Sequence, residues 1–451
     1  MKLDLTKMSS LHRENLCKKL QEGLVFGFGN KSLMRNGYDN YYSYRQNSHF
    51  LYLTGIQEED YAFILNLKSN EFTLFVPKID ALHIVWLGGV PSLSEAKQKY
   101  GADHVHYITD FSEHLKKQAA GKKKTYFLRT NNREVEKIFK KIFKVKPLEN
   151  ELLEVLAQLR FQKTPHEIEL MKKAAEIAAS GHIEVMKKCR PGLYEYEIQS
   201  YVEQKFREGG APFNAYDSIV GSGKNSAILH YFKNQDQLKK GDLLLIDAGA
   251  EYQGYASDIT RTFPVSGKFS QQQKDIYTIV LEAQLRSINM LKPGVLFKDY
   301  HVKAAHTIVE GLKDVGLVKG SLDALKEKRV DRLFFPHGLG HPLGLDTHDI
   351  DPHRGSKKKL SMARLKQDQK FEENSVVTAE PGIYFIQALL CDPKNRKEYA
   401  DFINWKKIES FLSFGGIRIE DDILVTRQGA VNLTHKVPKK ISDLEKLIGS
   451  E

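Results

Sequence analysis

The stretch Leu243-Leu244-Leu245-Ile246-Asp247-Ala248-Gly249 has the composition of a buried β-strand that ends in an acid. Asp258 follows eleven residues later in a second strand-like segment. A hairpin turn centred on Tyr252-Gln253 would place the two aspartates directly opposite each other, whereas a bulge at Gly254 would shift the register by one. Facing carboxylates in an apolar strand pair repel each other unless one is protonated or a cation lies between them. The hairpin therefore predicts a cation site.

Two further acids end strand-like segments of the same region. Glu380 follows Val376-Val377-Thr378-Ala379, and Glu420 follows Gly416-Ile417-Arg418-Ile419. Strand alternation places Arg418 on the face of Glu420 and turns Asp421 to the opposite face. One such acid alone is more often a strand-end cap or a surface charge. Four of them on apolar strands of one region favour a functional site.

Histidines complete the candidate ligand set. His337-Gly338-Leu339-Gly340-His341 is followed by His348, so three imidazoles lie within twelve residues. Four carboxylates and one histidine form an oxygen-rich set that suits Mn²⁺ or similar ions rather than a thiolate zinc site. Bridging carboxylates would hold two ions about 3.5–4 Å apart, as in two-metal hydrolases.

The chain is expected to form two domains, residues 1–160 and 161–451. The first alternates strand-like and helical segments, which is typical of an α/β domain. The capping box Thr164-Pro165-His166-Glu167 then begins a helix that Pro191-Gly192 should end. Pro293-Gly294 stands about a hundred residues later before another helical stretch, which suggests a duplicated α+β unit with the site between its halves.

Composition excludes several classes of protein. The net charge of +11 would be compatible with nucleic-acid binding. However, the lysine runs lack interleaved aromatics and zinc-finger spacing, so we expect a solvated surface and no nucleic-acid partner. No apolar run approaches the roughly 18 residues of a membrane helix, and no secretory signal is visible. Three scattered cysteines form neither a disulfide framework nor a zinc site. These features predict a cytoplasmic protein without a membrane partner.

Five stretches, in this order, resemble the metal-dependent creatinase/aminopeptidase family with the pita-bread fold, and within it the prolidases, which are Xaa-Pro dipeptidases. They are Ile246-Asp247-Ala248-Gly249, Ser257-Asp258-Ile259-Thr260-Arg261, His337-Gly338-Leu339-Gly340-His341, Ala379-Glu380-Pro381-Gly382-Ile383-Tyr384 and Gly416-Ile417-Arg418-Ile419-Glu420. Tyr44-Arg45-Gln46 and Trp86-Leu87-Gly88 resemble the N-terminal domain of that family. The resemblance thus implies an α/β N-terminal domain and an α+β pita-bread catalytic domain.

The resemblance also implies roles for individual residues. Two divalent ions, expected to be Mn²⁺, would be held by Asp247, Asp258, His341, Glu380 and Glu420, with Asp258 and Glu420 bridging them. All five positions carry the expected residue types, which argues against the metal-free and non-catalytic relatives. Further matches are the substrate-binding histidines His230 and His348, a tyrosine and an arginine near the metals, Tyr216 and Arg418, and a supporting or substrate-binding histidine, His337.

The expected mechanism is attack by a hydroxide that bridges the metals. Glu380 would accept the proton from water and pass it to the leaving proline nitrogen. His348 would hydrogen-bond the reacting carbonyl. An Xaa-Pro bond has no N–H, so it needs a dedicated pocket, with His230 against the proline ring.

A dipeptidase must also recognise the free carboxylate of proline. The resemblance implies an arginine in the loop before Glu380; an ungapped count reaches Lys366, and a small shift reaches Arg364. We expect Arg364, because arginine grips a carboxylate with two hydrogen bonds.

Three functions remain open. A homodimeric dipeptidase for proline-containing dipeptides is favoured by the prolidase-like N-terminal segment and by the long insertion between Glu380 and Glu420. An Xaa-Pro aminopeptidase acting on longer peptides would share every metal ligand. A basic, non-catalytic binding protein is the third alternative, against which the intact ligands speak.

Overall fold

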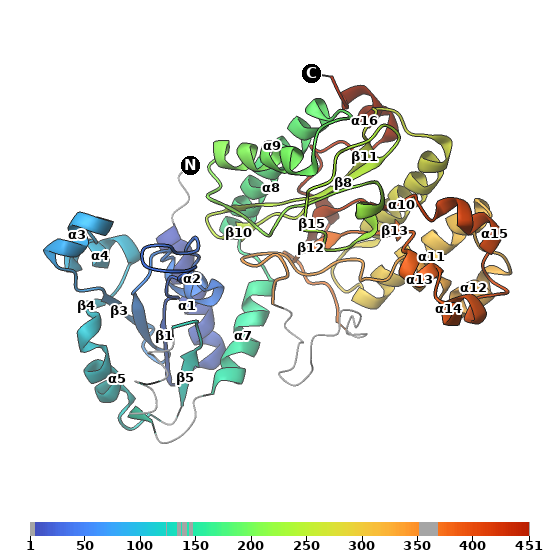
Figure 1. The fold of residues 1–451 in the computed structure, drawn as a ribbon. Coiled ribbons are helices and arrows are strands. Elements are labelled where there is room, and N and C mark those ends of the chain that lie inside the picture. Colours follow the sequence, from blue (N-terminus) through green and yellow to red (C-terminus); the bar gives the residue numbers. More distant parts are fainter. Residues whose placement is uncertain are drawn as a thin grey trace. The chain divides into compact units, whose positions relative to one another are not determined.

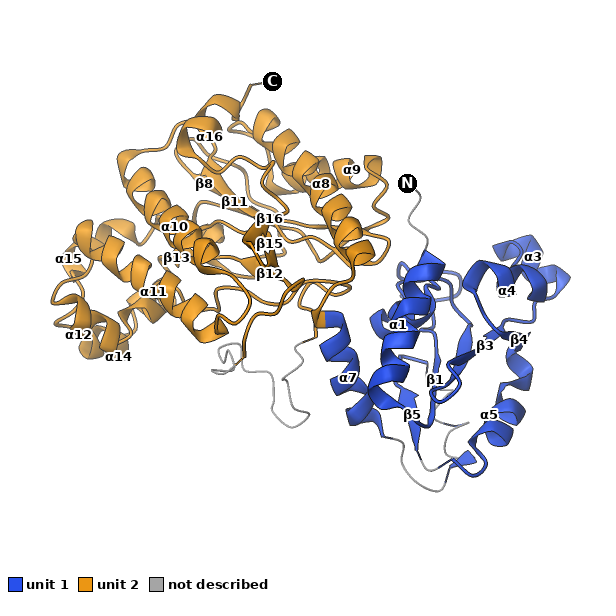
Figure 2. Cartoon of the chain, turned by 180° about the vertical axis from the view of Figure 1, so that it is seen from behind, with its two compact units in different colours: residues 1–160, 354–358 blue, residues 161–353, 359–451 orange. Residues whose placement is uncertain are grey.

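The computed structural model describes residues 5–122, 124–132, 137, 142–143, 148–350 and 369–450 (Figure 1). The described chain divides into two compact units, residues 5–160 and residues 161–450, each with its own fold (Figure 2). Within these described ranges, no helix is both long and apolar enough to span a bilayer.

The first unit is built on a mixed five-stranded sheet in the order β4-β3-β2-β1-β5. Strands β1, β2 and β3 pair antiparallel, while β3–β4 and β1–β5 are parallel. The strands are β1 (Leu24–Phe28), β2 (Ala62–Asn66), β3 (Glu71–Val76), β4 (His104–Tyr107) and β5 (Thr125–Leu128). The helices are α1 (Leu5–Leu20), α2 (Ser48–Thr54), α3 (Ala81–Leu87), α4 (Leu93–Tyr100), α5 (Phe111–Ala119) and α7 (Glu149–Phe161). Buried aromatic side chains of β1, β3 and α5 form much of its core, with ring centroids of Phe28 and Phe111 4.4 Å apart.

Long helices of the second unit come in two packed pairs. The first pair is α8 (Pro165–Lys188) with α9 (Glu195–Glu208), and the second is α10 (Gln271–Met290) with α11 (Phe297–Asp314). The predicted capping box is present, because Glu167 N–H donates to the Thr164 hydroxyl and the Glu167 carboxylate accepts from Thr164 N–H at 2.8 Å. Gly192 and Gly294 adopt similar left-handed conformations, φ +95° and +90°, in the turns between the helices of each pair. The repeated Pro-Gly pattern thus corresponds to a repeated helix pair.

The strands of this unit lie between the two helix pairs in both views (Figures 1 and 2). They form short antiparallel sheets in the orders β10-β9-β6, β11-β8-β7, β12-β15-β16 and β13-β14. Their bounds are β6 (Phe213–Asn214), β7 (Ile219–Ser222), β8 (Leu243–Asp247), β9 (Ala250–Tyr252), β10 (Tyr255–Ala256), β11 (Thr260–Pro264), β12 (Val376–Ala379), β13 (Gly382–Tyr384), β14 (Gly416–Arg418), β15 (Asp421–Thr426) and β16 (Gly429–Asn432). The unit also contains the short helices α12 (Leu322–Glu327), α13 (Gln387–Leu390), α14 (Pro393–Glu398), α15 (Trp405–Ile408) and α16 (Ile441–Leu447).

The predicted hairpin register is wrong by two residues. Asp247 pairs with Thr260 rather than with Asp258, and Tyr252 pairs with Tyr255. The turn is therefore Gln253-Gly254, and both residues have positive φ, +50° and +87°. A two-residue turn of this kind matches the twist of the flanking strands, and glycine adopts it without strain. Because the shift is an even number, it preserves the face on which Asp258 would lie.

Candidate metal centre

Asp247 and Asp258 meet at one tyrosine despite the shifted register. The Tyr216 hydroxyl lies 2.6 Å from an oxygen of each carboxylate. Both aspartates are at least nine-tenths buried. Since the hydroxyl has one proton, it donates to one carboxylate at a time, and the other oxygen faces its lone pairs. Such an arrangement favours a further proton or a cation at the aspartates.

Glu420 joins this pair through a strand contact between distant parts of the chain. Its backbone N–H donates to the Thr260 carbonyl, and the Thr260 hydroxyl donates to its carboxylate at 2.6 Å. The end of β14 is thereby fixed to the start of β11. Candidate ligand atoms of Asp258, His341 and Glu420 all lie within 4.8 Å of one another.

His341 presents a single ring nitrogen to this cluster. Its Nδ1 lies 3.0 Å from the Pro342 carbonyl, which can only accept, so Nδ1 carries the proton. Nε2 lies 3.4 Å from an Asp258 oxygen and 3.7 Å from a Glu380 oxygen. Gly340 allows this placement, because a Cβ there would stand 2.0 Å from the Thr378 carbonyl oxygen. Backbone support of the second nitrogen is the usual arrangement for a metal-binding histidine.

Burial and mutual repulsion dominate the electrostatics of the acids. Burial, with the charges of neighbouring carboxylates, raises the pKa of Glu420 well above its ordinary value and also raises that of Asp258. Burial raises the pKa of Glu380 to about 7. For His341, burial alone would lower the pKa, but the hydrogen bond with Asp258 and the charge of Glu380 raise it to about 9. Bound divalent cations would relieve this repulsion, so the four acids and one imidazole fit hard divalent ions.

Arg418 lies on the face of Glu420, as strand alternation predicts, and acts on the centre through Asp247. Its buried guanidinium donates to the Asp247 carboxylate, to the Thr260 hydroxyl at 3.1 Å and to the Tyr384 hydroxyl at 3.0 Å. Sequence reasoning gave Tyr384 no role, although it ends one of the quoted motifs. Arg418 thus orients a candidate ligand.

His337 has a protein partner on each ring nitrogen. Nδ1 lies 2.8 Å from the Gly338 carbonyl and Nε2 lies 2.8 Å from the Tyr384 hydroxyl. Burial lowers the pKa of His337 to about 3, so the ring is neutral. Nδ1 also stands 3.6 Å from a Glu380 oxygen. The His337 ring therefore lies next to the Glu380 carboxylate.

Two predicted substrate histidines are exposed next to the centre. The His348 ring centroid lies 4.0 Å from that of His341. The His230 ring stacks on Phe232 at 5.8 Å, and its charge contributes to the lowered pKa of His337. Both imidazoles are thus accessible to a ligand. Arg364 and Lys366 lie outside the described residues.

Asp421 points away from Glu420, as predicted, but it is not a surface acid. It is fully buried and accepts hydrogen bonds from Arg261 at 2.7 Å and Lys439 at 2.6 Å. Arg261 also donates to the carbonyls of Glu420 and Thr260. Burial alone would raise the pKa of Asp421, but the charges of Arg261 and Lys439 lower it to about 2. The ion pair between Arg261 and Asp421 supports the strand ends that carry the candidate ligands. Arg261, a charged residue within a strand-like segment, is the feature of the sequence that could have indicated this pair.

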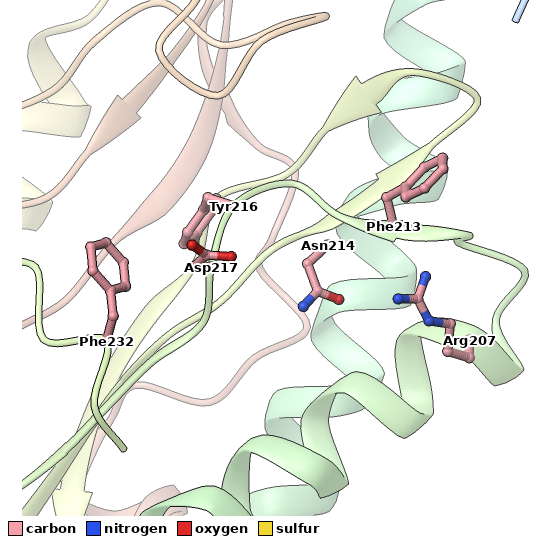
Figure 3. Close-up of a pocket in the computed structure, with 6 residues that line it drawn as sticks. All are labelled: Arg207, Phe213, Asn214, Tyr216, Asp217 and Phe232. Carbon is pink, nitrogen blue, oxygen red and sulfur yellow. The ribbon is translucent and has the colours of Figure 1, made fainter. Parts of the chain in front are cut away.

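A pocket of about 550 Å³, lined by polar and aromatic side chains, adjoins Tyr216 (Figure 3). Tyr216 links the pocket to the carboxylates, because the same side chain lines the pocket and contacts Asp247 and Asp258. The other lining residues are Arg207, Phe213, Asn214, Asp217 and Phe232. The pocket offers room for a ligand group beside the carboxylates.

Comparison with known proteins identifies the family. The model of metallopeptidase family M24 matches residues 169–427, and that of the aminopeptidase P N-terminal domain matches residues 10–127. The chain belongs to metallopeptidase family M24. Membership confirms the expected two-domain architecture with a pita-bread domain and implies divalent metal ions.

Individual relatives within M24 share most of the chain. It is 36% identical over 431 residues to a probable Xaa-Pro aminopeptidase of Leptosphaeria maculans, covering 95% of this chain and 76% of that protein. A probable Xaa-Pro aminopeptidase of Colletotrichum graminicola is 37% identical, with 94% and 92% covered. Aminopeptidase PepP of Pseudomonas aeruginosa superposes with a TM-score of 0.85 at 33% identity, covering 98% and 97%. A variant of Escherichia coli aminopeptidase P gives 0.86 at 33% identity, covering 98% of each chain.

The names of these relatives correct the prediction that the chain is a prolidase. The M24 metallopeptidase assignment is confirmed, but the relatives point to aminopeptidase P rather than to prolidase. The prolidase-like N-terminal segment instead belongs to a domain matched by the aminopeptidase P model. Short motifs common to both groups could not separate them.

Proposed function

We propose that this protein is a dinuclear Xaa-Pro aminopeptidase that removes one residue from the N-terminus of peptides longer than a dipeptide. The buried cluster of acids around Asp258, His341 and Glu420 carries the proposal, because it retains the ligand types a metallopeptidase needs. The match of residues 10–127 to the aminopeptidase P N-terminal domain supports the aminopeptidase over the dipeptidase.

The proposed ligands divide between two sites. Asp247 would serve one ion, His341 with Glu380 the other, and Asp258 with Glu420 both; Mn²⁺ is the expected metal because the set is rich in oxygen. When bound, such ions polarise a carbonyl and make water acidic enough to supply hydroxide near neutral pH.

Glu380 is the proposed proton carrier. Its carboxylate lies 3.7 Å from His341 Nε2 at the edge of the cluster, so it can accept a proton from water and return it to the leaving proline nitrogen. His337, hydrogen-bonded at both nitrogens, would limit the movement of the Glu380 carboxylate.

Other side chains would bind and orient the peptide. His348, exposed beside His341, can donate to the scissile carbonyl as negative charge develops on its oxygen. His230 and Phe232 offer a stacked pair of rings for the proline. Arg418 and Tyr216 would hold Asp247 in place. Arg364 or Lys366 would bind the free carboxylate of proline only in the dipeptidase alternative.

A single assay separates the alternatives. Purified protein is given Gly-Pro or Gly-Pro-Ala, with Mn²⁺ or with a chelator, and released glycine is measured; Gly-Ala-Ala is the control peptide. We expect cleavage of Gly-Pro-Ala with a much higher kcat/KM than Gly-Pro, loss on chelation and recovery with Mn²⁺. Preference for Gly-Pro would establish the dipeptidase, and no cleavage of either proline peptide would reject the proposal.

A homodimer in the cytoplasm remains a prediction. Light scattering of the purified protein and fractionation of cells test the two parts separately.

A further inference from the structure

Glu195, the first residue of α9, is a buried carboxylate outside the metal centre. Its side chain is fully buried, although a glutamate at the start of a helix is usually solvated. The helix is capped by a different acid, because Glu197 accepts the Tyr194 N–H at 2.8 Å. The burial of Glu195 is therefore not needed to cap α9.

All five donors to Glu195 come from one segment, residues 222–236. One carboxylate oxygen accepts from Ser222 N–H at 2.7 Å, Ser222 hydroxyl at 2.8 Å and Asn225 amide at 3.0 Å. The other accepts from the Tyr231 hydroxyl and the Asp236 N–H, each at 2.9 Å. These donors are uncharged, and each gives the buried carboxylate a hydrogen bond. Hydrogen bonds to a charged acceptor are stronger than neutral ones.

The same segment carries His230 and Phe232 to the metal centre. Residues 228–235 form no helix or strand, so little regular structure fixes them. Tyr231, which donates to Glu195, is buried, while its neighbours His230 and Phe232 are exposed. Phe232 lines the pocket beside Tyr216 (Figure 3). Anchoring Tyr231 inward thus turns the two flanking rings outward.

We propose that Glu195 is a positioning residue that fixes segment 222–236 and thereby sets the substrate-binding ring pair His230–Phe232. The proposal rests on the proposed function for the role of those rings in peptide binding. Within the described residues, the hydrogen bonds to the Glu195 carboxylate all come from segment 222–236 and none from a candidate ligand, so its loss should weaken peptide binding and leave the metals in place.

The test compares Glu195→Gln with Glu197→Gln, a matched change two residues away on the same helix. Glutamine keeps the shape of Glu195 but loses the charge and turns an amide donor toward groups that also donate. We expect KM for Gly-Pro-Ala to rise roughly tenfold or more, as when charged hydrogen bonds are weakened, with kcat changed less than threefold. Metal content should equal that of the wild type. Glu197→Gln should leave KM within about twofold.

A second readout does not depend on activity. Trypsin can cut after the exposed Lys224 and Lys233, which lie within the anchored segment. Glu195→Gln should speed cleavage at these two sites at least fivefold over the wild type, and Glu197→Gln should not. If Glu195→Gln fails to fold, Tyr231→Phe, which removes one donor, replaces it in the test. Tyr231→Phe should raise KM and the rate of cleavage, but by smaller factors than those expected for Glu195→Gln.

The outcomes separate the two proposals. A wild type inactive on proline peptides rejects the proposed function, while faster cleavage in Glu195→Gln would still show that Glu195 fixes the segment. An active wild type with unchanged KM and unchanged cleavage in Glu195→Gln overturns the positioning role. Loss of metal from Glu195→Gln would also overturn the positioning role, because the substitution would then affect the metal centre as well as peptide binding.

Discussion

Replacing Asp421 by asparagine should destabilise the second unit by about 3 kcal/mol. The substitution preserves shape but leaves Arg261 and Lys439 without a buried counter-charge. Removing one partner of a buried ion pair typically costs about 3–5 kcal/mol. The pKa of Asp421 points the same way: its depression from 3.8 to about 2 corresponds to roughly 2–3 kcal/mol of stabilisation.

The pH dependence follows from the direction of that pKa. A carboxyl whose pKa is lower in the folded protein stabilises it above the unfolded value, and this contribution is lost as pH falls from 3.8 toward about 2. The difference between wild type and Asp421→Asn should therefore be constant above about pH 5 and shrink below pH 4.

Guanidinium unfolding followed by tryptophan fluorescence measures the effect. The chain has two tryptophans, Trp86 in the first unit and Trp405 in the second, so a Trp86→Phe background reports on the second unit alone. Asp401→Asn, at an exposed acid of the same unit, is the matched control and should change the free energy of unfolding by less than about 0.5 kcal/mol. A loss below about 1 kcal/mol at pH 7 for Asp421→Asn would show that the buried ion pair does not stabilise the second unit to this extent.

Three further predictions concern the metals and the chemistry. Asp258→Asn should lose at least one bound ion and essentially all activity while keeping the far-ultraviolet circular dichroism of the wild type; two ions per chain with normal turnover would exclude a bridging role. His348→Ala should lower kcat about 10²–10³-fold with metal content unchanged, as when one donor to a developing oxyanion is removed; recovery by excess Mn²⁺ would instead make it a ligand. Because metal binding requires proton release from His341, whose pKa is about 9, and from acids whose pKa values burial raises, Mn²⁺ affinity should rise steeply with pH between pH 7 and 9, measured by chelator competition. An affinity independent of pH in that range would show that His341 does not exchange a proton for metal.

The clustering of the candidate acids could be expected from the sequence, because each acid follows or lies in apolar surroundings. Asp247 and Glu420 end apolar strands in which a carboxylate is costly without a partner, and that conflict is visible in one sequence. The register was not predictable to the residue, because it depends on which pair of turn residues adopts positive φ. Gln253 gave no sign of doing so, although Gly254 did.

Features that depend on distant chain segments were missed. Strand alternation predicts the direction of the Asp421 side chain but not its burial. Lys439 donates to Asp421, and the carbonyls of Val437 and Pro438 accept from its partner Arg261, so the burial depends on a later segment of the chain. The burial of Glu195 also depends on a distant segment, residues 222–236, which supplies the donors to its carboxylate. The choice between aminopeptidase and dipeptidase failed for another reason: both share the ligands, so the motifs carry no information on substrate length.

The contact between Thr260 and Glu420 also has a consequence for how the protein is made. The two residues are 160 positions apart, and Arg261 beside them is bonded to a carbonyl 176 positions away. A chain leaving the ribosome can therefore form its first helix pair and β8–β11 hairpin long before a complete set of ligands exists. On the proposed ligand set, metal acquisition would await the segment that carries Glu420, so bound ions would report on a finished fold rather than nucleate it.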